Sequence, residues 1–346
     1  MLLAELSLCC GPSGMEKATR EYLEKILKEH NIPCFTDSLG SLIAHNEGNK
    51  SGGSAIIFAP MDESGFIVSS IEKDGFIRFR VSGEIDPSCL IAKTVRIVPS
   101  GIRGVIGSKL FTRIKKDAYG KMVDPDDLYI DIGSTDEEDA RSRVHIGDRI
   151  LFDAPYKALG ENKIKMRSAD VKAACAILLD LLEKKPDVDF YACFCSLTTF
   201  SICGEKAFLG GLSAARRIHP DHGILLTGIE AKDTPGHEKY EMSAALGEGI
   251  ALRRWNGLYV FNPKTVNRAA ALAKKEKIAV QFPRENEKSD FCGARALASA
   301  DEGMDLLELS IPCRYQNTPV ATVDKRDIRS GADFIYHLIT EFDWRI

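Results

Sequence analysis

Two acidic side chains, Asp62 and Glu63, follow directly after an apolar run at residues 55–59 that is flanked by Gly53 and Pro60. An apolar run of this length between such residues predicts a buried strand. Open α/β sheets place their binding sites just beyond the carboxyl ends of the strands, so the carboxylate of Asp62 is a candidate binding group. The alternative is that Asp62 only caps a turn, a role in which aspartate is common.

The segments on either side of this strand have the spacing of helices and buried strands. A turn at residues 11–14 precedes a predicted helix, and Ser13 and Glu16 have the spacing of a capping box for it. The other predicted helices lie at 170–184, 206–217, 262–277 and 325–342, and the predicted strands at 32–37, 42–45, 55–59, 196–203, 223–228 and 306–311. Strands separated by helices imply a mostly parallel central sheet that is flanked by helices on both faces.

Residues 66–159 have a different pattern, with many short strands and few helices. Two alternating segments flank an Asp-Gly dipeptide at 74–75, which is typical of a β-hairpin. Further strands are predicted at 94–98, 104–107, 128–132 and 149–152, with one short acidic helix near 136–143. This spacing predicts a small β-barrel or sandwich. We therefore predict an α/β domain formed by residues 1–65 and 160–346, with residues 66–159 inserted as a β-rich domain.

The composition limits the classes of function. The formal net charge of −4 argues against a sequence-independent nucleic-acid binder, which needs a basic face. No apolar run approaches the roughly 18 residues of a membrane span, and Glu5 stands where a signal peptide would be basic, so we expect a cytoplasmic protein. The ten cysteines contain no Cys-x-x-Cys pair, which argues against a zinc ribbon and favours reduced core thiols.

Several motifs resemble those of one family. Residues 58–65 resemble the His-Met-Asp-Glu-x-Gly segment of the tetrahedral (TET) metallo-aminopeptidases, which include glutamyl and deblocking aminopeptidases. Further segments that resemble family motifs, in the same order, lie at 11–14, 127–133, 172–179, 233–236 and 310–315. The resemblance implies a zinc-exopeptidase-like α/β fold with an inserted small β-barrel. It also implies a homo-oligomer built from dimers, of which a dodecamer is one form.

The resemblance also assigns roles to single positions. In the family, the histidine of the first motif binds zinc and the aspartate orients it; these positions are Pro60 and Asp62 here. Asp62 and Arg314 are the candidate substrate-binding residues. The carboxylate that bridges two metal ions in the family falls on Asp170, although a residue at that place could instead cap the predicted helix. The remaining metal-ligand positions fall on Glu205, Thr227 and Asn317, and the general base on Gly204.

The position of the Glu-Glu pair of the family depends on the alignment. Placing it on Gly204 and Glu205 agrees with the downstream spacing of Gly210, Ala214, Ala215, Ile218, Pro220 and Asp221. A rival alignment puts the pair on Thr198 and Thr199, which leaves no glutamate at all.

The remaining ligands are too few for a dinuclear metal centre. Two ions about 3.5–4 Å apart need a shared carboxylate and about three protein ligands each. Asp170 and Glu205 supply only two carboxylates, and a glycine at position 204 accepts no proton from an attacking water. We therefore expect no firmly held cofactor and at most one weakly bound zinc, cobalt or manganese ion. The two acids form a polar pocket that still binds a peptide or a small amine under this hypothesis.

Other candidate ligands and nucleophiles are weaker. His219 and His222 form a His-x-x-His pair in a predicted loop, and His237 lies in another polar loop, where solvated histidines are more common than metal ligands. Cys203 has no histidine near it in the sequence that would act as its base.

Two functions remain open from the sequence. The first is a metallo-aminopeptidase-like protein with a disabled metal site that acts as a peptide-binding or scaffold subunit, alone or in a complex with active relatives. The second is a working aminopeptidase or other hydrolase with a rebuilt single-metal site that includes Asp170 and Glu205.

Overall fold

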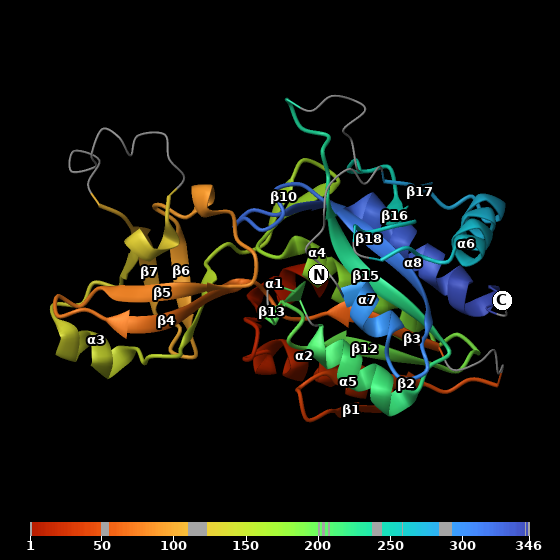
Figure 1. Ribbon diagram of the computed structural model, residues 1–346, viewed down its shortest axis with the longest axis horizontal. Coiled ribbons are helices and arrows are strands. Elements are labelled where there is room, and N and C mark those ends of the chain that lie inside the picture. The colour runs from red at the N-terminus through yellow and green to blue at the C-terminus, as the bar shows by residue number, and fades with distance from the viewer. Residues whose placement is uncertain are drawn as a thin grey trace.

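The computed structural model describes residues 2–49, 55–109, 123–199, 201–202, 205–206, 208–236, 244–257, 259–283, 293–342 and 344. The chain folds into an α/β part and a separate β-barrel, which lie side by side (Figure 1). Among these residues, no helix is both long enough and apolar enough to cross a membrane.

An eight-stranded sheet forms the centre of the α/β part. Its strands are, in spatial order, β1 (Cys34–Thr36), β2 (Leu42–Asn46), β12 (Phe190–Cys195), β3 (Ala55–Pro60), β15 (His222–Glu230), β18 (Asp305–Cys313), β16 (Ile250–Leu252) and β17 (Val280–Gln281). The four central strands, β12, β3, β15 and β18, run parallel to one another. The predicted mostly parallel sheet is confirmed, and every residue of β3 is buried, as expected for a strand covered on both faces.

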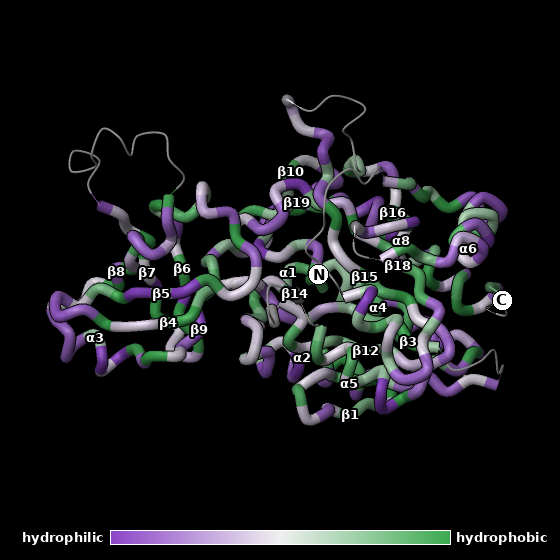
Figure 2. The backbone as a smooth tube through the Cα atoms, in the orientation of Figure 1, coloured by the Kyte–Doolittle hydropathy of each residue, from purple (hydrophilic) through white to green (hydrophobic). Residues whose placement is uncertain are grey.

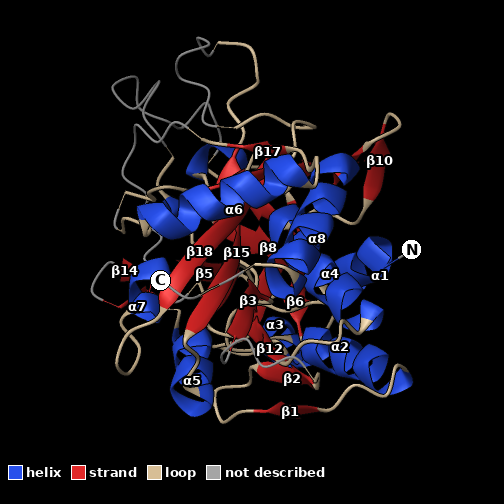
Figure 3. Ribbon diagram, turned by 90° about the vertical axis from the view of Figure 1, so that its right-hand side faces the viewer, coloured by secondary structure: helices blue, strands red, loops and turns tan. Residues whose placement is uncertain are grey.

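Helices cover both faces of this sheet. They are α1 (Leu2–Leu8), α2 (Lys17–Glu29), α4 (Ala169–Lys184), α5 (Leu209–Ile218), α6 (Pro263–Lys275), α7 (Gly293–Ala298) and α8 (Lys325–Thr340). Figure 3 shows α4 and α8 on one face and α5 and α7 on the other. Helix α4 is buried along most of its length because it packs between the sheet and α8, so its Ala- and Leu-rich sequence suits its place. As predicted, the Asn262 side chain caps α6 by accepting a hydrogen bond from Lys264 N.

The barrel closes in the order β4 (Gly65–Ile71), β5 (Ile77–Ser82), β8 (Tyr129–Asp131), β7 (Arg103–Gly107), β6 (Thr94–Val98) and β9 (Arg149–Phe152). The short helix α3 (Glu137–Arg143) begins after Asp136, whose side chain accepts a hydrogen bond from Asp139 N. The barrel has its own hydrophobic core, with members between residues 66 and 154. The core of the α/β part draws on residues 6–61 and 164–344. Figure 2 shows polar segments on the outer side of the barrel, for example at helix α3.

The first barrel strand begins at a close backbone approach to another barrel strand. A Cβ on Gly65, the first residue of β4, would lie 2.3 Å from the carbonyl oxygen of Ile150 in β9. Glycine is therefore required where the chain leaves the central sheet for the barrel. Smaller elements complete the fold: β10 (Lys157–Leu159), β11 (Lys163–Lys165) and β19 (Thr322–Asp324) form a three-stranded sheet, and η1 (Pro87–Cys89) and η4 (Pro125–Asp127) are 3-10 turns.

Two local predictions were wrong. The strand expected at 196–203 lies instead at β12, which ends at Cys195, because Leu197 has a left-handed backbone (φ 51°) that cannot continue a strand. A short hairpin follows, formed by β13 (Ser201–Ile202) and β14 (Glu205–Lys206). The predicted capping box does not form among the described residues either. Helix α2 begins at Lys17, and Ser13 Oγ has no hydrogen-bond partner. Glu16 Oε1 instead accepts hydrogen bonds from Gly14 N and Leu197 N.

Candidate functional site

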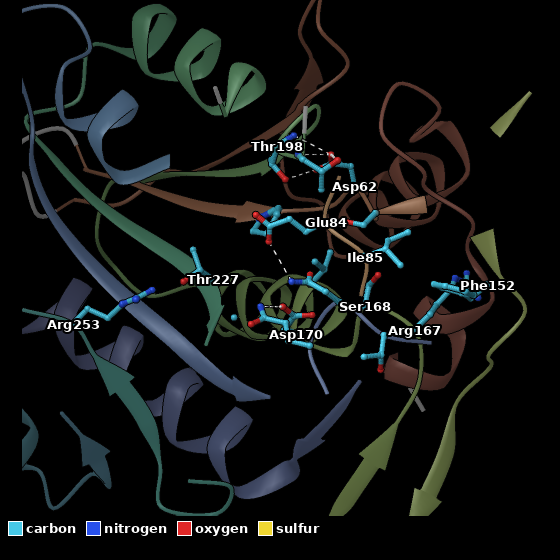
Figure 4. Close-up of a pocket in the computed structure, with 18 residues that line it drawn as sticks. Asp62, Glu84, Ile85, Phe152, Arg167, Ser168, Asp170, Thr198, Thr227 and Arg253 are labelled. Atoms are coloured by element: carbon cyan, nitrogen blue, oxygen red, sulfur yellow. Dashed lines mark hydrogen bonds between the residues drawn. The ribbon is translucent and has the colours of Figure 1, made fainter. Parts of the chain in front are cut away.

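A cavity of about 310 Å³ lies where the carboxyl ends of β3, β12 and β15 face the barrel (Figure 4). Its described lining comes from both parts of the molecule and is formed by Pro60, Asp62, Ser64, Glu84, Ile85, Phe152, Arg167, Ser168, Asp170, Val171, Thr198, Thr199, Thr227, Gly228, Arg253, Gln316, Asn317 and Thr318. Of the residues predicted for the site, the structure brings Pro60, Asp62, Asp170, Thr227 and Asn317 together here. The position agrees with the rule that α/β sheets bind ligands at the carboxyl ends of their strands.

Asp62 is fully buried, and both of its carboxylate oxygens accept hydrogen bonds from the end of β12. The backbone N–H groups of Thr198 and Thr199 donate to Oδ2 at 2.9 and 3.0 Å. The hydroxyl of Thr198 donates to Oδ1, and that of Thr199 donates to Oδ2 at 3.1 Å. Four donors therefore satisfy this carboxylate, and Asp62 joins the ends of β3 and β12 rather than capping its own turn.

The neighbouring Glu63 forms a buried ion cluster with two cations. Its Oε2 lies 2.9 Å from Arg167 Nε, and its Oε1 lies 3.0 Å from Lys172 Nζ and 3.1 Å from the backbone N of Gly11. Glu63 and Lys172 are fully buried, and Arg167 is 7% exposed. Burial opposes ionisation of Glu63, but the charges of Arg167 and Lys172 outweigh it and hold the pKa of this carboxyl below its usual range.

This lowered pKa predicts a pH dependence of stability. The stabilisation from ionised Glu63 is fully present above the ordinary glutamate pKa of about 4.3 and is lost as the pH falls from there toward the lower pKa of the folded state. We expect the free energy of unfolding, measured by urea titration at a series of pH values, to fall in this acidic range. A flat profile between pH 5 and about pH 3 would contradict the assignment.

Asp170 is the second residue of α4 and points into the cavity (Figure 4). Its Oδ2 accepts a hydrogen bond from Gln316 Nε2 at 2.8 Å. The neighbouring strand permits this contact, since a Cβ on Gly228 would lie 2.1 Å from Asp170 Oδ2. The N-cap position of α4 belongs to Ser168, so Asp170 lies in the first turn, where the helix dipole favours its charge.

Thr227 belongs to a second buried polar cluster, of which Thr227 and Arg253 line the cavity. Its hydroxyl lies 2.8 Å from Glu308 Oε1 and 2.8 Å from Ser310 Oγ. Arg253 Nη1 donates to the same Glu308 oxygen at 3.0 Å, and Asn256 Nδ2 donates to Glu308 Oε2 at 2.9 Å. Glu308 is fully buried, so its negative charge depends on these donors.

Two further candidates lie in the segment after β18. Asn317 lines the cavity, and its Nδ2 donates to Glu84 Oε2 of the barrel at 3.2 Å, while its backbone oxygen accepts from Asp86 N. Arg314 forms a bidentate pair with Asp233, at 2.6 and 2.7 Å. Arg314 is not among the described lining residues of the cavity; its guanidinium joins the residue after β18 to Asp233, in the loop after β15.

A sequence model of one family, described as M42 glutamyl aminopeptidase, matches residues 40–334. This chain belongs to that family. The chain is 28% identical to the lysyl aminopeptidase of Pyrococcus furiosus, and the similarity covers 96% of this chain and 94% of that protein. The resemblance to the TET metallo-aminopeptidases is confirmed.

Solved structures of related proteins have the same fold. An aminopeptidase from the archaeon Desulfurococcus kamchatkensis is 28% identical, covers 98% of this chain and 94% of its own, and superposes with a TM-score of 0.89. The TET1 peptidase of Pyrococcus horikoshii, which can assemble into a tetrahedron or a large octahedral shell, is 22% identical with a TM-score of 0.82, and each chain is covered to 98%. The predicted α/β fold with an inserted β-barrel is therefore confirmed.

The remaining candidate metal ligands and nucleophiles of this M42 protein lie away from the cavity or outside the described residues. His219 Nδ1 lies 2.9 Å from Asp301 in an exposed loop, and the His222 ring stacks on Trp344, where burial lowers the pKa of the imidazole. The two histidines therefore have different partners. Cys203, Gly204 and His237 lie outside the described residues. For Glu205 the structure describes the backbone, which lies in β14 opposite Ile202.

Arg253, Glu308 and Gln316 take part in the cavity or its support, although none of them was predicted from the sequence. A signal for Glu308 was present, because a lone glutamate in the apolar strand at 306–311 requires a buried partner. Its partner at position 253 is distant in the sequence, so no local pattern identified the pair. Gln316 stands one position before Asn317, the position to which the family resemblance gives a metal ligand.

A search of the described residues for three or more clustered His, Cys, Asp or Glu side chains that could hold a metal finds one group, Glu276, His337 and Glu341. This group lies outside the cavity, on α8 and the end of α6. Lys275 Nζ lies 2.8 Å from a carboxylate oxygen of each glutamate, so the two carboxylates already share one cation. The cluster is a surface salt-bridge network.

Proposed function

We propose that this chain is an M42-family protein that binds peptides in the cavity but has lost two-metal hydrolysis, and that it acts as a binding or scaffold subunit. The observation that carries the proposal is the environment of Asp62. In the family that the chain resembles, this carboxylate orients a metal-bound histidine; here Pro60 takes the place of that histidine, and four donors from Thr198 and Thr199 satisfy the carboxylate.

The geometry supports the rival alignment of the Glu-Glu pair. Cys195 at the end of β12 pairs with Pro60 at the end of β3, so the residues just after β12 face the residues just after β3. Thr198 and Thr199 therefore lie in the cavity wall next to Asp62, at the place where the family motif would supply its general base. A threonine hydroxyl that donates to a carboxylate is no general base near neutral pH.

The described donors around the cavity do not fit two divalent ions. Asp62, Thr227 and Asn317 each use side-chain atoms in contacts with Thr198, Glu308 and Glu84. The guanidinium of Arg253 lies in the same wall and repels a cation at short range. Of the two carboxylates proposed as metal ligands, only that of Asp170 has a described place in the cavity. This supports the binding of at most one zinc, cobalt or manganese ion, held weakly.

Calorimetric titration with zinc, manganese and cobalt tests the proposal. We expect no pair of sites with micromolar affinity, and no release of amino acids from short peptides when these ions are added. The expected heat, if any, is that of a single weak site that Asp170→Asn removes. Two tight sites, or metal-dependent hydrolysis that Asp170→Asn abolishes, would contradict the proposal and favour an active aminopeptidase with a rebuilt site.

We further propose that the protein is cytoplasmic and forms a homo-oligomer. The assembly of the TET1 peptidase of Pyrococcus horikoshii, which has the same fold, supports an oligomer built from many subunits. Sedimentation velocity measures this directly, and a monomer at micromolar concentration would contradict it.

A further inference from the structure

The cavity contains a charged group that the M42 motifs do not account for, the guanidinium of Arg253. Arg253 follows β16, lies in the cavity wall and is 6% exposed. Glu308 holds it at two points: Arg253 Nη1 donates to Glu308 Oε1 at 3.0 Å, and Arg253 N donates to the backbone oxygen of Glu308 at 3.1 Å. Asn256 binds the other carboxylate oxygen of Glu308. The guanidinium is therefore a fixed cation of the wall.

Strand β15 separates this cation from a fixed anion. The Thr227 hydroxyl points to Glu308 Oε1, the oxygen that also accepts from Arg253, whereas the next residue, Gly228, lies against the carboxylate of Asp170. Figure 4 shows Arg253 and Asp170 on different sides of Thr227, both at the cavity. The wall thus presents charges of opposite sign at two defined places, and the cation stands next to a position that the family resemblance gives to a metal ligand.

Asp62 and Arg167, two other charged groups of the wall, already have strong partners. Four hydrogen bonds from Thr198 and Thr199 stabilise the charge of Asp62. Arg167 is committed to Glu63, which lies outside the cavity lining. Of the remaining charged groups, Arg253 and Asp170 line the α/β side of the cavity, and Glu84 lines the barrel side, where it accepts a hydrogen bond from Asn317.

We propose that the ligand is a free amino acid or a dipeptide, with its α-carboxylate at Arg253 and its amino group at Asp170. This inference rests on the proposed function, because it names the ligand of the same cavity. A guanidinium is planar, carries five N–H donors and serves several acceptors at once, so it suits carboxylate recognition. The volume of about 310 Å³ is at the lower end of small-molecule sites, and a ligand of one or two residues suits it better than a long peptide.

Calorimetry with three forms of alanyl-leucine tests this inference on the unmodified protein. We expect the dipeptide with free termini to bind, and we expect its C-terminal amide and its N-acetyl form each to bind at least about tenfold more weakly, since a charge-assisted hydrogen bond is lost in each case. Equal affinity of the amide and the free acid would overturn the role of Arg253 but leave peptide binding intact. Absence of binding by any form, and by longer peptides, would overturn the proposed function itself.

Variants of Arg253 test whether this side chain causes the preference for the free acid over the amide. In Arg253→Lys the charge remains but the planar fork is lost, and we expect the preference for the free acid over the amide to shrink severalfold. Arg253→Met leaves Glu308 buried without its cation, so the combined variant Arg253→Met, Glu308→Met removes both charges if the single variant does not fold. The matched control is Arg254→Met, because Arg254 is exposed and stacks on Phe282. A preference for the free acid that survives in the folded double variant would refute the assignment.

Discussion

Replacement of Glu63 by glutamine is expected to lower the free energy of unfolding by about 3–5 kcal/mol, because it leaves two buried cations without their counter-charge. Arg167 and Lys172 both bind Glu63, and neither has more than 7% of its surface in contact with solvent. Water cannot replace the lost charge at Lys172 without opening the contact between α4 and β3. Urea denaturation at pH 7 measures the change.

The control for this prediction is Glu72→Gln. Glu72 pairs with Arg78 at 3.0 Å, but both side chains are more than a third exposed. Pairs of this kind typically contribute about 0–1 kcal/mol, so the control variant should remain close to the unmodified protein. If both variants lost the same small amount of stability, the buried cluster would contribute no more than a surface pair, and the prediction would be wrong.

The second large effect is expected for Asp62→Ala, which we expect to destabilise the protein by about 2–3 kcal/mol through the loss of a shared acceptor. The N–H groups of Thr198 and Thr199 both donate to Asp62, and Thr198 is buried. The loss of stability should be the same with a chelator as with added zinc, because the partners of Asp62 are protein groups. Thermal unfolding in about 1 mM 1,10-phenanthroline and, separately, in about 1 mM zinc measures both points.

Asp333→Ala serves as the control here, since Asp333 is exposed on α8 and lies 4.0 Å from the exposed Lys184. Its effect should be within about 0.5 kcal/mol. A strong stabilisation of the unmodified protein by zinc that disappears in Asp62→Ala would mean that Asp62 orients a metal ligand after all, and the proposed function would then fail with it.

The elements that the sequence predicted well are those with a local cause. The run at 55–59 has no polar residue, and it forms the fully buried strand β3. The Asp-Gly dipeptide at 74–75 lies between β4 and β5, which pair as predicted. Asn262 and Pro263 begin α6 because one supplies a cap and the other lacks an N–H that the first turn would leave unbonded.

The errors have a common cause in contacts between distant parts of the chain. Strand β12 ends at Cys195, opposite the last residue of β3 some 130 residues earlier in the sequence, and the left-handed Leu197 follows, so the strand predicted at 196–203 lies too late. Glu16 has the spacing of a capping box, but its carboxylate binds the N–H of Leu197. In both cases a tertiary partner overrode a local preference.

The sequence by itself determined that this M42 protein lacks imidazole at positions 60 and 317 and carboxylate at 227, since side-chain chemistry is fixed by residue type. Only the tertiary structure decided which groups surround these positions. The carboxylate of Asp62 binds Thr198 and Thr199, 136 and 137 residues away, and Glu308 holds Arg253 in the cavity wall. A buried charge must be balanced by whichever group the fold brings within about 3 Å, and that choice depends on strand order and not on neighbours in the sequence.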